Sequence, residues 1–123
     1  AENSLLSSKY DLHADILKVG HHGSTDSSSS DFLERVNPKV SIIEVGKDND
    51  YGHPNKETIE ALKKIGSKIY RTDQDGTIEV TTNGRSFSVK NKKTQNTADL
   101  TAQEYIQTPQ VYMWFLEPSV AES

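Results

Sequence analysis

Two short polar segments carry the residue types that could do chemistry. Residues 21–24 read His-His-Gly-Ser, and residues 48–54 read Asp-Asn-Asp-Tyr-Gly-His-Pro. Imidazole is the commonest neutral metal ligand and titrates near neutral pH, so these histidines could bind a metal ion or move a proton. A zinc site needs at least three protein ligands, and one histidine pair supplies only part of such a set. Taken alone, each segment is also typical of a solvated turn, which is the commoner use of such residues.

Each of the two segments directly follows a predicted strand. Residues 15–19 form a β-branched-rich run that Gly20 ends, and residues 40–45 are almost continuously apolar, as in strands covered on both faces. Open α/β sheets place their sites beyond the carboxyl ends of the parallel strands. We therefore expect both segments to lie at the edge of the sheet that carries the site.

Helix signals complete an α/β layout around these strands. Asp31 is predicted to cap a helix that stops at Asn37-Pro38. Asn55 is predicted to cap a second helix, which Gly66 ends. A third strand is predicted over residues 68–71. The order strand, helix, strand, helix, strand predicts the α/β class.

A β-hairpin is predicted after the third strand. Asn83-Gly84 is the strongest short hairpin signal, and it lies between predicted strands at 77–82 and 85–90. A two-residue turn would place Val80 opposite Phe87 on one apolar face. The hairpin therefore ends the predicted order of elements.

Composition excludes several classes of protein and site. The chain has 123 residues, no cysteine and a formal net charge of −4, so thiolate zinc sites and disulfide frameworks are excluded. The charge disfavours a protein that coats nucleic acid but is compatible with a local site. The longest apolar run, residues 111–116, is far shorter than the about 20 residues of a membrane-spanning helix. We expect that run to be buried, and we expect residues 102–106 to form a helical turn.

Short motifs follow one another in a distinctive order along residues 2–89. They lie at residues 17–24, 27–29, 32–33, 38, 45–46, 51–54, 70–73 and 75–76. This ordered set resembles the ComEC-type metallo-β-lactamase-fold hydrolases, a family that includes the domain attached to the bacterial DNA-uptake competence channel and free-standing secreted or surface hydrolases.

The resemblance implies a fold, a cofactor and site residues. The fold would be an αββα sandwich with two divalent metal ions, zinc or manganese, that activate a hydroxide for attack on a phosphoester. His22 would be a metal ligand and His21 would face the substrate phosphate or orient a ligand, although these two roles could be exchanged. His53 and Tyr51 would lie near the scissile phosphate, and Ser24 would help to hold it.

The chain departs from the family in what it lacks. The main metal motif of the family, His-x-His-x-Asp-His, is absent, and so is the Thr-Gly-Asp that carries the bridging carboxylate. The resemblance therefore covers only the C-terminal half of the domain, in residues 1–90, and residues 91–123 are a linker and tail of unknown role. We expect this chain alone to bind metal weakly or not at all and to be inactive, because its partner would be the missing N-terminal half.

The resemblance leaves the substrate and the assembly open. The substrate would be DNA in the competence setting and another phosphoester in a free-standing enzyme, at the surface of a bacterium or secreted from it. We expect no membrane insertion by this segment. Apolar surface left by the missing half could form a homodimer through the exposed sheet or the tail. A non-catalytic binding or assembly module that keeps the half-fold as a scaffold is the alternative function.

Overall fold

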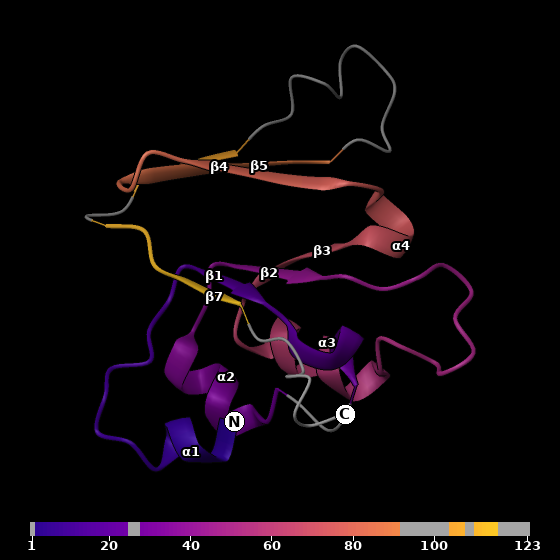
Figure 1. Cartoon of the computed structure of the whole chain (residues 1–123), viewed down its shortest axis with the longest axis horizontal. Coiled ribbons are helices and arrows are strands. Elements are labelled where there is room, and N and C mark those ends of the chain that lie inside the picture. The colour runs from indigo at the N-terminus through magenta and orange to yellow at the C-terminus, as the bar shows by residue number, and fades with distance from the viewer. Residues whose placement is uncertain (1, 25–27, 92–103, 108–109, 116–123) are drawn as a thin grey trace.

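The structure, a computed structural model, describes residues 2–24, 28–91, 104–107 and 110–115. The described elements form three layers (Figure 1). Helices lie on one face of a four-stranded parallel sheet, and a three-stranded antiparallel sheet lies on the other face. Among these residues, no helix is long and apolar enough to cross a membrane.

The parallel sheet has the order β3-β2-β1-β7. Its strands are β1 (Ile16–Lys18), β2 (Val40–Ile43), β3 (Lys68–Arg71) and β7 (Met113–Phe115). Helix α2 (Ser30–Val36) connects β1 to β2, and α3 (Lys56–Lys64) connects β2 to β3. The predicted α/β class is therefore confirmed, because strands and helices alternate and neighbouring strands run parallel.

One apolar core lies between the parallel sheet and the helices. Phe32, Leu33 and Val36 are the buried face of α2, and Leu62 is the buried apolar residue of α3. Helix α1 (Glu2–Leu6) packs on the same cluster through Leu5 and Leu6. The cluster also contains Leu12, Ala14, Leu17, Val19, Ile43 and Val45.

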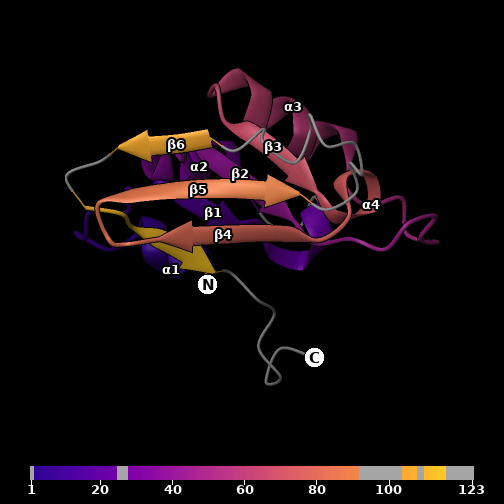
Figure 2. The same ribbon diagram turned by 90° about the horizontal axis from the view of Figure 1, so that it is seen from above.

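A second core lies between the two sheets. The antiparallel sheet consists of β4 (Ile78–Thr82), β5 (Ser86–Asn91) and β6 (Glu104–Gln107), in the order β4-β5-β6, and it lies over the parallel sheet (Figure 2). Phe87 and Val89 of β5 pack against Ile16, Val40 and Tyr70 of the parallel sheet. The parallel sheet is thus covered on both faces, which explains the continuous apolar run of β2. Within the described residues, both faces of the parallel sheet are thus covered by this chain, and a homodimer through an exposed sheet or the tail stays a prediction.

Three local predictions are wrong. The hairpin register differs by two residues: Val80 lies opposite Val89, because the Asn83 side chain accepts hydrogen bonds from the N–H groups of Arg85 and Ser86 and makes a longer turn. A shift of two keeps every side chain on its predicted face. The cap of α2 is Ser29, whose Oγ accepts from the N–H of Phe32, and not Asp31. Residues 104–107 form strand β6 and not a helical turn.

Strand β7 anchors the tail against β1. The backbone N–H of Asp15 donates to Tyr112 O at 2.8 Å, and the buried Asp15 carboxylate accepts from the Tyr112 N–H at 3.0 Å. Trp114 packs on the core beside the helices and donates from Nε1 to Leu12 O at 2.9 Å. Within the run expected to be buried, Tyr112 and Phe115 are instead 50% and 60% exposed, and residue 116 lies outside the described residues. The boundary at residue 90 stays a prediction, although strands from beyond it join both sheets.

Candidate histidine site at the strand ends

Three histidines from the two polar segments come together at the carboxyl ends of β1 and β2. His21 and His22 lie in a 3₁₀ turn, Gly20–Gly23, directly after β1, and His53 lies in the loop after β2. The ring centroids of His21 and His53 are 5.9 Å apart, and those of His22 and His53 are 6.4 Å apart. The edge predicted from the strand order is therefore where these imidazoles meet.

Two adjacent non-glycine residues in this turn have left-handed backbones. The φ angles of His21 and His22 are 49° and 53°. A left-handed conformation costs roughly 1–2 kcal/mol per non-glycine residue, and such strain concentrates at functional sites. The turn keeps both rings near His53, whereas a continued strand would have sent them to opposite faces.

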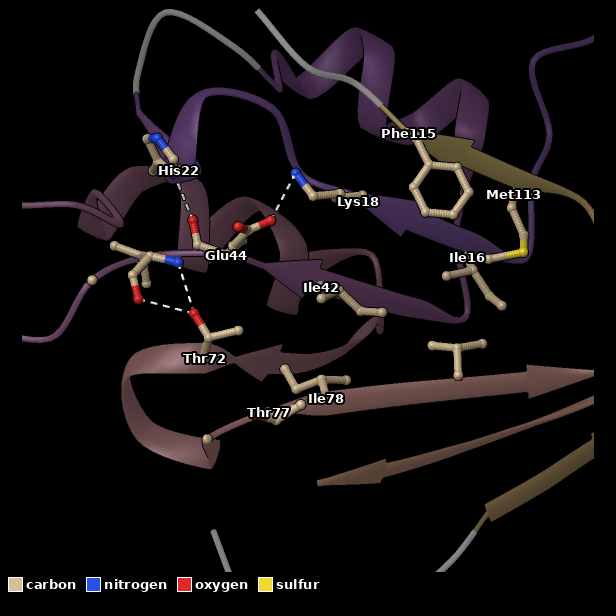
Figure 3. A pocket seen from close by; sticks show the side chains of 14 residues that line it. Ile16, Lys18, His22, Ile42, Glu44, Thr72, Thr77, Ile78, Met113 and Phe115 are labelled. Atoms are coloured by element: carbon tan, nitrogen blue, oxygen red, sulfur yellow. Dashed lines mark hydrogen bonds and ion pairs between the residues drawn. The ribbon is translucent and has the colours of Figure 1, made fainter. Parts of the chain in front are cut away.

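The His22 ring has a defined tautomer. Its Nδ1 lies 2.7 Å from the backbone carbonyl oxygen of Glu44, and Figure 3 shows this contact at one end of a cavity. A carbonyl oxygen only accepts, so Nδ1 carries the proton. In the neutral ring, Nε2 then has a lone pair that can bind a metal ion or accept a proton. Histidines that ligate metal ions commonly donate a hydrogen bond from their other ring nitrogen in this way.

A close contact at Gly23 holds the two loops together. The N–H of Asn55 donates to Gly23 O at 2.9 Å. The backbone of Gly23 has a φ of +78°, and a Cβ atom there would lie 2.6 Å from the Cβ of Pro54. Only glycine combines this backbone with this approach. The contact explains why His21 and His22 lie beside His53.

Tyr51 lies beside the histidine cluster, and Asn49 holds the loop that carries Tyr51. The Tyr51 ring lies 5.7 Å from the His53 ring and is 81% exposed. The side chain of Asn49 makes four hydrogen bonds within residues 46–53. Asn49 was not among the candidate site residues, although an asparagine before a turn is a known signal for such bonds.

Ser24 and the serines after it are held by contacts within this chain. Ser24 is 4% exposed, and its carbonyl oxygen lies 3.4 Å from the Thr58 hydroxyl, which donates to it. The N–H groups of Ser28 and Ser29 donate to the Glu2 carboxylate. Residues 25–27 lie outside the described residues. The role of Ser24 in holding a phosphate stays a prediction, and the amide donors of Ser28 and Ser29 bind a carboxylate of this chain.

A cavity of about 880 Å³ lies between the two sheets and reaches His22 (Figure 3). An ion pair of 3.4 Å between Lys18 Nζ and Glu44 Oε2 forms part of its lining. Most other lining side chains are apolar and come from both sheets: Ile16, Ile42, Ile78, Val80, Met113 and Phe115. The histidine cluster therefore adjoins an apolar space and not only bulk solvent.

The described residues do not complete a metal site. His22 has the geometry of one ligand, but in the part of the chain that the structure describes no group of three or more His, Cys, Asp or Glu side chains could hold a metal ion. Zinc sites use three or four protein ligands. His22 therefore fits as a ligand of the metal that the resemblance implies, but the described side chains together do not form a complete site for that metal.

Thr72 ties the base of the second loop to the end of β3. Its Oγ1 donates to Val45 O at 2.9 Å and accepts from the Val45 N–H at 2.8 Å. Helix α4 (Thr72–Asp75) holds Thr72 in place, with Asp75 accepting from the backbone N–H of Arg71 and Asp73 forming a salt bridge with the Arg71 guanidinium. Asp73 and Asp75 therefore serve the turn.

We expect Thr72→Val to lower the free energy of unfolding by about 1–3 kcal/mol, because it leaves two backbone groups of Val45 without their partner. Urea denaturation followed by far-UV circular dichroism measures this change. Thr72→Ser keeps the hydroxyl and is the control. Equal stability of the valine and serine variants would contradict the role given to this hydroxyl.

Comparison with known proteins finds relatives that are much longer than this chain. The chain is 38% identical over 90 residues to "ComE operon protein 3" of Bacillus subtilis (strain 168), an overlap that covers 73% of this chain and 12% of that protein. It is 38% identical over 68 residues to "Competence protein ComA" of Neisseria gonorrhoeae, covering 55% of this chain and 10% of that protein. It is 38% identical over 66 residues to "Recombination protein 2" of Haemophilus influenzae, covering 54% and 8%.

These similarities relate the chain to competence proteins, and the chain spans about a tenth of the length of each of these relatives. No family model and no solved structure matches the chain.

Proposed function

We propose that this chain is the C-terminal half of a metallo-β-lactamase-fold domain and that it supplies one side of the active site of a metal-dependent hydrolase of phosphodiester bonds. The observation that carries the proposal is His22, whose Nδ1–H is held by Glu44 O so that Nε2 can act as a ligand, beside His21 and His53. This arrangement lies where α/β sheets place their sites. Relatives named for competence and recombination support DNA as the phosphodiester.

The metal site would be shared with the rest of a longer protein. Two divalent ions, zinc or manganese, would supply a water of lowered pKa when bound. His22 would contribute one ligand, and the remaining ligands would come from the N-terminal half of the domain. By itself this chain would hold metal weakly, because among the described residues no group of three or more ligating side chains could hold a metal ion.

The other residues would act on the substrate from this side. His21 and His53 lie next to each other and can donate hydrogen bonds to a phosphate oxygen. Tyr51 lies beside His53 and would be exposed to an incoming substrate. In a competence protein the substrate would be DNA outside the cytoplasm, and both the substrate and the location are part of the proposal.

The complete gene product should hydrolyse bis(p-nitrophenyl) phosphate in the presence of manganese. Loss of a residue that only orients a metal ligand lowers activity by about 10–100-fold. His22→Ala removes the ligand itself and should therefore lower the rate by more than that. His13→Ala is the matched control, because His13 precedes β1, away from the histidine cluster, and its ring contacts Val36 O. Unchanged hydrolysis by the His22 variant would refute the ligand assignment.

A calorimetric titration of the 123-residue chain with Zn²⁺ and Mn²⁺ tests the shared site. We expect at most weak binding that is lost in His22→Ala. Tight binding of two ions by this chain alone would contradict the proposal that the ligands are divided. A complete gene product that binds DNA but neither binds metal nor hydrolyses the ester would support the alternative, a non-catalytic binding or assembly module.

A further inference from the structure

Asn49 supports the loop that carries His53 and Tyr51. Its Oδ1 accepts from the N–H groups of Tyr51 and His53 at 3.1 and 3.0 Å. Its Nδ2 donates to the carbonyl oxygens of Gly46 and His53 at 3.1 and 2.7 Å. One half-buried side chain thus binds the backbone of the loop at its start, at Tyr51, and on both sides of His53.

These four bonds hold a loop that has no helix or strand. Residues 44–55 form no helix or strand, so the four bonds of Asn49, together with the contact of Pro54 and Asn55 with Gly23, restrain the loop instead. A residue whose N–H and C=O are both bound to one amide group cannot rotate without breaking those bonds. Asn49 therefore restrains the backbone that carries the His53 ring, and this ring contacts the rings of His21, His22 and Tyr51.

The chemistry of the four bonds requires a carboxamide. Two of the bonds need an acceptor and two need a donor, and an asparagine side chain offers both in one plane. Aspartate would keep the two bonds from Tyr51 and His53 and lose the two bonds to carbonyl oxygens. Alanine would lose all four. The aspartate and alanine variants of Asn49 therefore separate the effect of the two donated bonds from the effect of the two accepted bonds.

We infer that Asn49 is a positioning residue, which sets the rings of His53 and Tyr51 against His21 and His22. Its effect on catalysis rests on the proposed function, but its effect on the rings does not. A site in which the reacting groups must be placed within a fraction of an ångström loses rate when such a support is removed.

Nuclear Overhauser contacts between rings test this inference in the 123-residue chain without any metal or substrate. The wild type should show contacts between Tyr51 and His53 and between His21 and His53. Asn49→Ala should lose both while the contacts within the core around Phe32 and Leu62 persist. Asn49→Asp should show weakened contacts of intermediate intensity.

Asn83→Ala is the matched control. Asn83 Oδ1 accepts from the N–H groups of Arg85 and Ser86 in the exposed hairpin turn, so this variant loses comparable bonds away from the site. It should lower stability and leave the ring contacts intact. Wild-type ring contacts in Asn49→Ala would overturn the inference, because Asn49 would then only stabilise the loop. If the alanine variant does not fold, unchanged contacts in Asn49→Asp would overturn it in the same way, and weakened contacts would support it.

A second measurement separates this inference from the proposed function. If the complete gene product hydrolyses bis(p-nitrophenyl) phosphate, Asn49→Ala should lower kcat by about 10–100-fold and Asn83→Ala should leave it unchanged. An inactive gene product with the expected ring contacts would refute the proposed function and leave the positioning role standing. An active gene product with unchanged kcat in Asn49→Ala would refute the positioning role alone.

Discussion

Gly23→Ala is expected to lower the free energy of unfolding by about 2–4 kcal/mol, the sum of a strained backbone and an overpacked contact. The alanine Cβ would lie 2.6 Å from the Cβ of Pro54 and 3.2 Å from its Cα, and backbone cannot move aside as a flexible side chain would. The loops after β1 and β2 would separate, and His21 and His22 would lose their contact with His53. Urea denaturation measures the first effect, and ring contacts in nuclear magnetic resonance spectra measure the second.

Two other glycines separate the causes of this effect. Gly52 has a φ of +69°, and a Cβ atom there would have no neighbour within 4 Å, so Gly52→Ala should cost only the backbone strain of roughly 1–2 kcal/mol. Gly46 has neither a positive φ nor a close neighbour, so Gly46→Ala should be almost neutral. A Gly23→Ala protein as stable as Gly52→Ala would show that the contact with Pro54 contributes nothing.

Trp114→Ala is expected to lower the free energy of unfolding by about 2–4 kcal/mol, somewhat less than a fully buried tryptophan would. The indole packs on the core beside the helices, and its loss leaves Leu12 O without its hydrogen-bond donor. The variant tests whether strand β7 is an integral part of the fold, because β7 forms one edge of the parallel sheet. Urea denaturation followed by far-UV circular dichroism gives the value.

Phe115 is the matched control on the same strand. Its side chain is 60% exposed, and Phe115→Ala should cost less than about 1 kcal/mol. Trp114 is also the single tryptophan of the chain, so its fluorescence reports on β7. In the wild type, fluorescence and circular dichroism should give the same unfolding midpoint. A fluorescence transition at lower urea would show that β7 leaves before the rest unfolds.

Local sequence patterns were sufficient for the framework of the molecule. The apolar runs and their Gly and Pro boundaries predicted β1, β2, β3 and the helices between them, because burial on two faces and turn chemistry act within a few residues. The same patterns placed the two polar segments at strand ends. That His21, His22 and His53 share one edge follows from the strand order alone.

Contacts between distant residues required the folded chain. The pairing of β1 with β7, which joins Ile16 to Met113, has no local signal, and neither does the cover that the antiparallel sheet forms over β1 and β2. The hairpin register depended on the side-chain bonds of Asn83, which compete with the two-residue turn that Asn83-Gly84 favours. Such features depend on which of several permitted local geometries packs best.

The features of the histidine site also fall into those that the sequence indicates and those that only the folded chain shows. The residue types of the histidine cluster and their chemistry can be read from residues 21–24 and 48–54, since imidazole behaves alike wherever it is placed. The tautomer of His22 and the contact of Gly23 with Pro54 come from the tertiary structure, whereas the support from Asn49 is local, because its partners lie two to four residues away. The two tertiary contacts depend on a backbone group or a surface that folding brings within about 3 Å, a distance at which hydrogen bonds and close packing act and which sequence spacing does not specify.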